Sequence, residues 1–157
     1  MTTNHSHATS GYKCPICLGV KEIENEDTML KRADLVYKDD LVSAFINSFW
    51  IDTAKGHVIV VPNEHFENLY DIPEKVGHRL FEVMQKISIA MKNAYKCDGI
   101  TTRQNNEPAG NQHAFHFHWH IFPRYTGDAY NENMAKKSIV STPEERLPYV
   151  KKLKEYI

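Results

Sequence analysis

The order of strand and helix patterns in this sequence fits an α+β domain, in which short β-strands are combined with one long helix. Two observations carry this expectation. Residues 116–122 alternate histidine with large apolar side chains, which is the period of a β-strand, and shorter apolar runs elsewhere are bounded by turn residues. Residues 76–94 instead repeat apolar side chains at helical spacing. The length of 157 residues fits one such domain.

The composition indicates a folded chain with little net charge. Hydrophobic residues make up 41% of the sequence, which is enough for a core, and the formal net charge is −1. Such a chain has no global basic field, so we expect neither nucleic acid nor an anionic membrane as a partner. We recognise no signal peptide and no apolar run that could cross a bilayer. The three cysteines argue against a disulfide framework and for a reducing compartment, so a cytoplasmic protein is expected.

Three segments are expected along the chain. Residues 1–12 are small and polar and should form a flexible N-terminal tail. Residues 13–125 contain the strand patterns and the long helical pattern, and they form the domain. Residues 126–157 should be a C-terminal extension packed on that domain. Thr142 and Glu145 have the spacing of a capping box, which predicts a short C-terminal helix.

Four short strands are expected before the histidine stretch. The first two form a hairpin across a polar turn at residues 38–40, and Asn47 follows the end of the second. Pro62 ends the third strand, and His65 lies just beyond it. The four expected strands are residues 35–37, 41–46, 56–61 and 100–103.

A long helix is expected between the third and fourth strands. It starts at Asp71-Ile72-Pro73, because proline is tolerated in the first turn of a helix. Its apolar side chains recur at helical spacing, so one stripe of the helix should be buried. That stripe consists of Val76, Leu80, Val83, Ile87, Met91 and Ala94.

The histidine stretch should place three imidazoles in a row. In a strand, successive side chains point to opposite faces, so His116, His118 and His120 would share one face. The large apolar residues between them would anchor the other face in the core. Pro123 is expected to end the regular pairing. The alternative is a strand whose solvated polar face happens to be histidine, but imidazole is the usual nucleophile and metal ligand near neutral pH.

The spacing of a second motif, Cys14-Pro15-Ile16-Cys17, is compatible with two functions. A C-x-x-C pair is either a redox motif or half of a zinc site. The redox motif should follow a strand in a thioredoxin-like unit, and no strand pattern precedes it here. The zinc site needs two further ligands elsewhere in the chain.

The pattern His-φ-His-φ-His-φ-φ resembles the signature of the histidine triad (HIT) family of nucleotide hydrolases and transferases. Gln112 precedes the first histidine by four positions, as in that family. Gly56-His57 and the turn after the third strand, with His65, also resemble the family's middle strand and following turn. The resemblance implies an α+β fold, an antiparallel sheet with a long helix packed on it, usually as a homodimer. This agrees with the order of elements expected above.

The resemblance also implies roles for the residues that match. His118 is expected to be the nucleophile that attacks the α-phosphorus, and His120 to hold the phosphate on the leaving-group side. His57 is expected close to the nucleophile. The family's nucleotide contacts fall on Asn47 for the ribose, and on Asn105 and Gln112, in the polar loop at residues 104–112, for ribose and phosphate.

Two positions depart from the family pattern. His113 stands where the family often has Ser or Thr against phosphate, and Asn111 replaces a frequent glycine. A histidine can donate to a phosphate oxygen, but it is larger and would change the shape of the pocket. His113 is therefore expected either to contact phosphate or to be a solvated loop residue.

A branch of the family binds zinc, and the resemblance implies the two ligands that the C-x-x-C pair lacks. By position, the set is Cys14, Cys17, His65 and His116. Two thiolates and two imidazoles make a closed structural zinc site, which leaves no open position for catalysis. The alternative is two reduced thiols beside a histidine that only forms hydrogen bonds.

The implied activity is that of a nucleotide phosphoramidase or dinucleoside polyphosphate hydrolase with a purine nucleotide substrate. The reaction would pass through a nucleotidyl-histidine, because a neutral imidazole is nucleophilic and its phosphorylated form is labile. Two alternatives stay open. One is a nucleotidyltransferase with an acceptor other than water, and the other is a zinc-stabilised nucleotide-binding module with little turnover.

Overall fold

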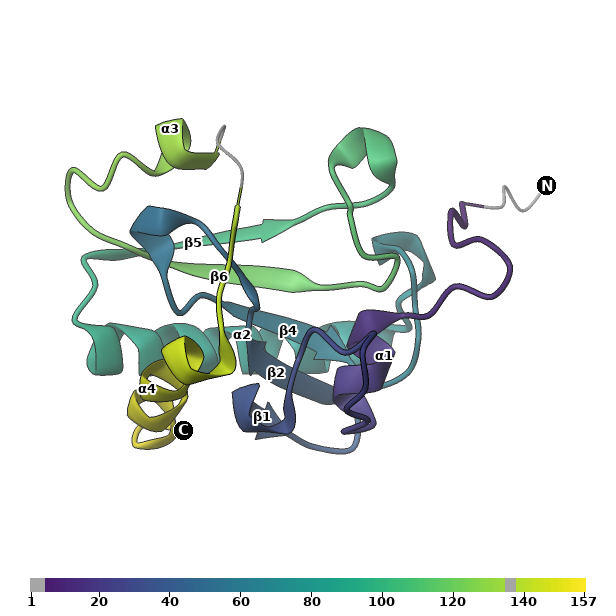
Figure 1. Ribbon diagram of the computed structural model, residues 1–157, viewed down its shortest axis with the longest axis horizontal. Coiled ribbons are helices and arrows are strands. Elements are labelled where there is room, and N and C mark those ends of the chain that lie inside the picture. The colour runs from purple at the N-terminus through teal and green to yellow at the C-terminus, as the bar shows by residue number, and fades with distance from the viewer. Residues whose placement is uncertain (1–4, 135–137) are drawn as a thin grey trace.

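An antiparallel β-sheet is the frame of the molecule in the computed structural model, which describes residues 5–134 and 138–157 (Figure 1). Its strands, in spatial order, are β1 (Leu35–Lys38), β2 (Val42–Ile46), β4 (Val58–Pro62), β6 (Trp119–Arg124) and β5 (Gly99–Gln104). The helices are α1 (Pro15–Val20), α2 (Glu74–Tyr95), α3 (Tyr130–Met134) and α4 (Pro143–Lys154). The expected α+β class is confirmed.

Shorter elements lie in the connections between these strands and helices. A separate small sheet pairs β3 (Phe49–Trp50) with β7 (Ile139–Val140). Four 3₁₀ turns among the described residues are η1 (Arg32–Asp34), η2 (Asp52–Ala54), η3 (Leu69–Asp71) and η4 (Pro108–Gly110). The four strands predicted before the histidine stretch are all present, with boundaries that shift by at most two residues.

The hairpin of β1 and β2 turns at Asp39. Its carboxylate accepts hydrogen bonds from the backbone N–H groups of Leu41 at 2.8 Å and Val42 at 2.9 Å. An aspartate that bonds the backbone two and three residues ahead favours a tight turn. The polar turn predicted at residues 38–40 therefore has a specific cause.

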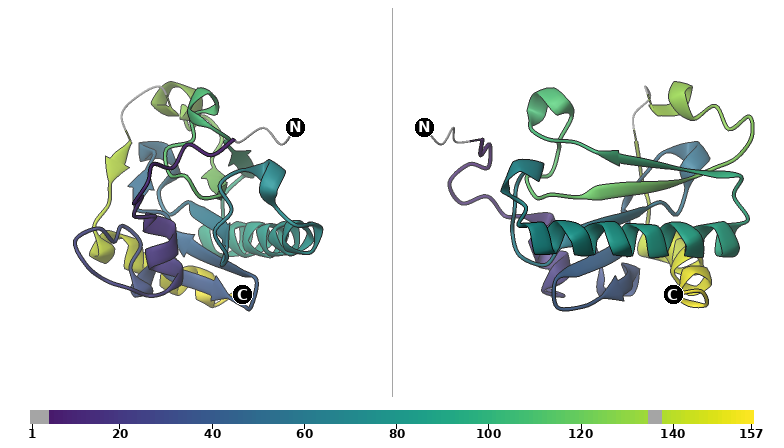
Figure 2. Two further views of the ribbon diagram at one scale, coloured as in Figure 1. Left: turned by 90° about the vertical axis from the view of Figure 1, so that its right-hand side faces the viewer. Right: turned by 180° about the vertical axis from the view of Figure 1, so that it is seen from behind.

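Helix α2 lies along one face of the sheet and packs against β4 and β6 (Figure 2). It is 22 residues long and begins after Pro73, which is its N-cap, so the helix starts slightly later than predicted. The predicted apolar stripe is buried except at Ala94, which is half-buried. Lys96 adopts the left-handed conformation, with φ of 54°, and ends the helix.

The apolar half of the histidine stretch anchors it as predicted. Phe117, Trp119 and Ile121 all pack into the core cluster that faces α2. The first part of the stretch is not a strand, because β6 begins at Trp119 instead of at His116. There the backbone N–H of Phe117 donates to the carbonyl of Phe66 at 2.6 Å. This part of the chain therefore pairs with the turn after β4, and the predicted strand start is wrong.

The other end of β6 also differs from the prediction. Pro123 does not end the pairing, because it stands opposite Ile100 on β5 and the strand continues to Arg124. On its other side, β4 pairs with β6 only as far as Ile121. The missing N–H of Pro123 therefore costs no hydrogen bond with β4.

The C-terminal segment is fixed to the domain by a buried ion pair. Thr142 and Glu145 form the predicted capping box at the start of α4. In the first turns of α4, Arg146 binds both carboxylate oxygens of Asp34 in η1, at 2.7 Å and 2.9 Å. Both side chains are almost fully buried, at 2% and 1% exposure. Removing either partner would leave an unpaired buried charge, which costs about 3–5 kcal/mol.

The N-terminal segment follows the surface of the domain from His5 onward, while residues 1–4 of the expected tail lie outside the described residues. The Ser6 hydroxyl donates to Glu67 at 2.7 Å, and the backbone N–H of His7 donates to the same carboxylate at 2.5 Å. The His7 ring lies 3.0 Å from Glu107, in the loop after β5. Within the described ranges, every helix is too short or too polar to span a bilayer.

Candidate functional site

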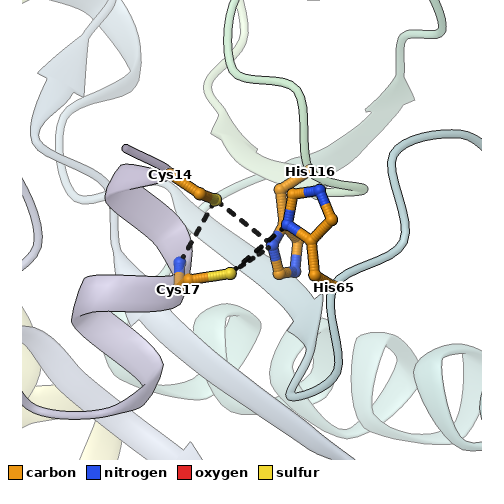
Figure 3. A group of neighbouring side chains, drawn as sticks. All are labelled: Cys14, Cys17, His65 and His116. Atoms are coloured by element: carbon orange, nitrogen blue, oxygen red, sulfur yellow. Dashed lines mark hydrogen bonds between the residues drawn. The ribbon is translucent and has the colours of Figure 1, made fainter. Parts of the chain in front are cut away.

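Two cysteines and two histidines from distant parts of the sequence meet at one end of the sheet (Figure 3). Cys14 is the N-cap of α1 and Cys17 lies in its first turn, so the short helix presents both sulfurs together. His65 follows β4, and His116 precedes β6. One ligand atom from each of the four lies within 4.8 Å of the others. The structure therefore brings together all four residues predicted as metal ligands.

The ring of His116 is oriented for a metal by a backbone carbonyl. A carbonyl only accepts hydrogen bonds, so His116 Nε2, which lies 3.0 Å from the carbonyl of Pro62, must carry the hydrogen. Its Nδ1 then has the lone pair, and it lies 3.4 Å from both Cys14 Sγ and Cys17 Sγ. His65 Nδ1 approaches Cys17 Sγ at 3.3 Å. A backbone partner of this kind fixes the tautomer of metal-binding histidines.

The two thiols share their protons unequally. A hydrogen bond from Cys17, assisted by His116, lowers the pKa of Cys14 to about 3 against the opposing effect of burial. The pKa of Cys17 is raised in turn, because it donates to the Cys14 thiolate and is partly buried. This direction favours ionisation of Cys14 first, and a bound dication would favour loss of the second proton from Cys17. The donor set of two sulfurs and two imidazole nitrogens fits zinc.

His118 is oriented for a different kind of chemistry. Its Nδ1 lies 2.7 Å from the carbonyl of His116, so Nδ1 carries the hydrogen and Nε2 keeps its lone pair. The side chain is nearly buried, at 7% exposure, and its ring centroid lies 4.8 Å from that of His120. A neutral imidazole with a free Nε2 in a fixed orientation is a competent nucleophile.

His57 and Asn47 extend the histidine row across the sheet. Asn47 Nδ2 donates to His57 Nε2 at 2.9 Å and to the carbonyl of Phe49 at 3.1 Å. His57 Nε2 also lies 3.4 Å from His120 Nδ1. With both amide hydrogens of Asn47 engaged, its Oδ1 is the atom that can accept a hydrogen bond from a ligand hydroxyl.

Burial keeps these imidazoles neutral. It lowers the pKa of His57 to about 3 and that of His118 to about 4. It also places the pKa of His120 well below its usual value, with the neighbouring His118 and His57 adding to the effect. The positive charge of Arg103 lowers the pKa of all three. At neutral pH the imidazoles of His57, His118 and His120 are therefore free bases, which is the form that a nucleophile needs.

Two of the predicted substrate residues are engaged in holding the loop after β5. Gln112 is buried, its Oε1 accepts from the backbone N–H of Glu107 at 2.7 Å, and its Nε2 donates to the carbonyl of Glu67 at 2.7 Å. Asn105 donates to the carbonyl of Gly110 within the loop. In this structure, Gln112 braces the loop through both ends of its amide.

His113 lies on the surface, close enough to His120 for a positive charge on its ring to lower the pKa of His120 further. It is therefore exposed and lies in the neighbourhood of the histidine row.

Sequence reasoning missed Arg103, which stands on β5 directly opposite His120 on β6. Residues paired directly across an antiparallel ladder project from the same face. The strand at residues 100–103 was predicted, but its register against the histidine stretch was not. Alternation of side chains along the fourth strand assigns Arg103 to one of its two faces. It does not specify that Arg103 lies opposite His120.

Comparison with known proteins matches most of the chain, including the histidine stretch, to a known domain. A model of the HIT domain matches residues 30–127. An uncharacterized HIT-like protein of Saccharolobus solfataricus is 38% identical over 113 residues, which cover 72% of this chain and 77% of that protein. An adenylylsulfatase of Arabidopsis thaliana is 30% identical over 71% of this chain and 54% of its own length. An adenosine 5′-monophosphoramidase of Saccharomyces cerevisiae is 31% identical over 46% of this chain and 43% of its own length.

Solved structures share the fold over most of the chain. A HIT-like protein of Bartonella henselae, described as involved in cell-cycle regulation, is 32% identical, with a TM-score of 0.68 over 79% of this chain and 86% of its own. A hypothetical histidine triad nucleotide-binding protein of Sulfolobus tokodaii is 25% identical, with a TM-score of 0.74 over 91% of both chains. A zinc-bound histidine triad protein of Mycobacterium smegmatis, at 24% identity, has a TM-score of 0.71 over 92% of both chains.

Proposed function

The chain belongs to the HIT family, and from that premise we propose that it is a nucleotide hydrolase acting at the α-phosphorus through a nucleotidyl-histidine. The bond cleaved is a phosphoric anhydride or a phosphoramidate. The observation that carries the proposal is the orientation of His118. Its Nδ1 donates to the carbonyl of His116 at 2.7 Å, which leaves Nε2 unprotonated and available for attack.

The reaction follows from this orientation in two displacements. His118 Nε2 attacks the α-phosphorus, a phosphorus–nitrogen bond forms, and the leaving group departs with the electron pair of the bond that breaks. The departing nitrogen of a phosphoramidate also takes up a proton from solvent. The ring then carries positive charge, and the carbonyl of His116 stabilises it through the Nδ1 hydrogen. Water attacks the same phosphorus next, the electron pair returns to Nε2, and one proton passes to solvent. The product is a nucleoside monophosphate.

The neighbours of His118 support this chemistry. His120 stands beside the nucleophile on the same face and would hold the phosphoryl oxygens. His57 lies against His120, and it accepts a hydrogen bond from Asn47, which follows the end of β2. We propose that Asn47 Oδ1 accepts a hydrogen bond from a ribose hydroxyl, which sets the nucleoside over β2 and β4 with its phosphate over β6.

The named relatives favour the same class of reaction. An adenylylsulfatase and an adenosine 5′-monophosphoramidase both act on an adenylyl group linked through its phosphorus. The alignment covers only 54% of the first protein and 43% of the second. The two names share an adenosine nucleotide and differ in the leaving group, so they support a purine nucleotide as substrate without selecting the leaving group. We propose adenylyl compounds as the first substrates to test.

We propose that Cys14, Cys17, His65 and His116 hold one zinc ion. The support is the convergence of the four ligand atoms and the tautomer of His116, whose lone pair faces both sulfurs. When bound, zinc would cross-link α1 to two other segments, the turn after β4 and the residues before β6. All four positions of such a site are filled by protein, so catalysis rests on the histidines beyond it.

A homodimer is also part of the proposal. Strand β5 is an edge of the sheet, and on α2 the large apolar side chains of Phe81 and Ile89 are more than half exposed. An unpaired edge and exposed apolar side chains favour pairing with another chain. Light scattering on the purified protein decides between one and two chains per particle.

The stereochemical course at phosphorus tests the covalent mechanism. Two in-line displacements retain configuration, whereas direct attack by water inverts it. We expect retention with an adenosine 5′-phosphorothioate substrate that is chiral at the α-phosphorus. His118→Ala should yield no covalent adenylyl-protein after an alkaline quench, whereas His78→Ala, which removes an exposed histidine of α2, should label as the wild type does. Inversion at phosphorus would exclude the nucleotidyl-histidine.

A further inference from the structure

Arg103 differs from the other four arginines of the chain in its charge partners. The other four bind carboxylates, in the pairs Arg32–Glu22, Arg79–Asp39, Arg124–Asp128 and Arg146–Asp34. Arg103 forms no ion pair with any carboxylate in the part of the chain that the structure describes. A cation that is half-buried without a counter-ion is unfavourable, so its environment is suited to an anion from outside the chain.

The contacts that Arg103 does make are weak ones. Its Nη1 lies 3.3 Å from the thioether sulfur of Met134, and its guanidinium carbon lies 5.4 Å from the ring centroid of Phe122. Its Nε is buried, and no acceptor among the described residues reaches it. A thioether is a poor acceptor, and a buried donor without a partner is destabilising. The guanidinium thus lies beside an aromatic ring and a thioether, and no oxygen acceptor among the described residues binds it.

The position of Arg103 in the sheet puts it next to the proposed site of reaction. It stands opposite His120 in the β5–β6 ladder, on the face of the sheet that carries the histidine row. The sheet order β2-β4-β6-β5 then puts Asn47 and His57 on one side of that row and Arg103 on the other. Its charge reaches the histidines, since it contributes to the lowered pKa of His57, His118 and His120.

We propose that Arg103 binds an oxyanion, phosphate or sulfate, in the leaving group of the substrate. This rests on the proposed function: with the ribose at Asn47 and the α-phosphorus at His118, the leaving group points across β6 toward β5. The planar guanidinium suits bidentate binding of such an oxyanion. It follows that the chain prefers adenylyl compounds with an anionic leaving group over phosphoramidates that release ammonia.

In the first displacement, Arg103 would stabilise charge without transferring a proton. The bond between the α-phosphorus and the bridging oxygen breaks, and its electron pair stays on that oxygen. The guanidinium remains protonated and donates hydrogen bonds to the leaving phosphate or sulfate as the charge develops. With a phosphoramidate, the departing nitrogen brings no oxyanion, so Arg103 has nothing to bind.

Three substrates with the same adenosine separate this role from others. They are diadenosine tetraphosphate, adenylyl sulfate and adenosine 5′-phosphoramidate. Arg103→Met should lower kcat/KM about 100-fold for a substrate with an anionic leaving group and less than about 3-fold for the phosphoramidate. A loss confined to the tetraphosphate would identify phosphate as the ligand, and a loss confined to adenylyl sulfate would identify sulfate. An equal loss on all three would overturn the proposal.

Two further variants control for charge and for folding. Arg32→Met removes an exposed arginine beside β1, at the opposite edge of the sheet, and should leave all three kcat/KM values unchanged. Arg103→Lys keeps the charge without the planar fork and should recover part of the loss on the anionic substrates only. A role limited to packing on Phe122 would move the three substrates together and would contradict the proposal.

A binding measurement distinguishes failure of this inference from failure of the proposed function. Inorganic pyrophosphate is titrated into zinc-replete wild-type protein and into Arg103→Met and Arg103→Lys, and the heat of binding is recorded. We expect at least about 10-fold weaker binding to Arg103→Met. If the wild type turns over no adenylyl compound but shows this loss, the hydrolase is wrong and the anion site stands. If pyrophosphate binds both proteins equally, the anion site is wrong.

Discussion

His116 and His118 are two residues apart in the sequence, yet their rings present different nitrogens and serve different chemistry. His116 donates its Nε2 hydrogen to the carbonyl of Pro62, at 3.0 Å, and turns Nδ1 to two cysteine sulfurs. His118 donates its Nδ1 hydrogen to the carbonyl of His116, at 2.7 Å, and keeps Nε2 free. The comparison teaches that the accepting carbonyl decides which nitrogen has the lone pair, and so which chemistry each ring can perform.

The largest expected effect separates the nucleophile from the metal ligands. His118→Ala should lower kcat by at least about 10⁴-fold, because removing a covalent nucleophile removes the pathway. It should keep one zinc per chain, since the four sulfur and nitrogen ligands remain. Steady-state kinetics and elemental analysis of the same sample measure both. The control variant His78→Ala should change neither kcat nor zinc content. Loss of zinc from His118→Ala would contradict separate roles for His116 and His118.

The next largest effect is expected from variants of the proposed zinc ligands. Cys14→Ser or His116→Ala should lose the zinc, and the cross-link between α1 and the sheet with it. We expect a fall of at least about 6 °C in Tm, because about 3 kcal/mol or more is lost and each kcal/mol shifts Tm by about 2–4 °C in a chain of this size. Calorimetry on samples of known zinc content measures this. A zinc-free Cys14→Ser protein with the Tm of the wild type would contradict a structural metal.

The smallest expected effect concerns the buried imidazole next to the row. Burial lowers the pKa of His57 to about 3, whereas in the unfolded chain a histidine titrates near 6.5. Between these values the unfolded state binds the extra proton, so the free energy of unfolding falls as the pH falls below about 6.5. At pH 5.5 His57 should account for about 1.4 kcal/mol of this fall.

A matched variant isolates the contribution of His57. His57→Gln should unfold in urea with a smaller difference between pH 7.5 and pH 5.5 than the wild type. Any release of zinc at the lower pH affects both proteins and cancels in the comparison. Equal pH dependence in the two proteins would show that His57 is not buried in its neutral form.

Local periodicity was sufficient to predict much of the fold. The buried stripe of α2 and the inward row of Phe117, Trp119 and Ile121 were predicted because alternation and helical spacing are properties of neighbouring residues. The ends of the histidine strand were predicted wrongly, at His116 and at Pro123. Those boundaries depend on where β4 and β5 run alongside, and the partner strands come from other parts of the sequence.

The sequence by itself determined which chemical groups the site holds: two thiols at C-x-x-C spacing and three imidazoles at period two. The tertiary structure decided how each group is used. The carbonyl of Pro62 sets the tautomer of His116, the β5–β6 register brings Arg103 to His120, and the turn after β4 holds the amide of Gln112. Each of these contacts joins segments that are remote along the chain. A tautomer depends on the acceptor that a ring meets in space, and no pattern of neighbouring residues specifies that acceptor.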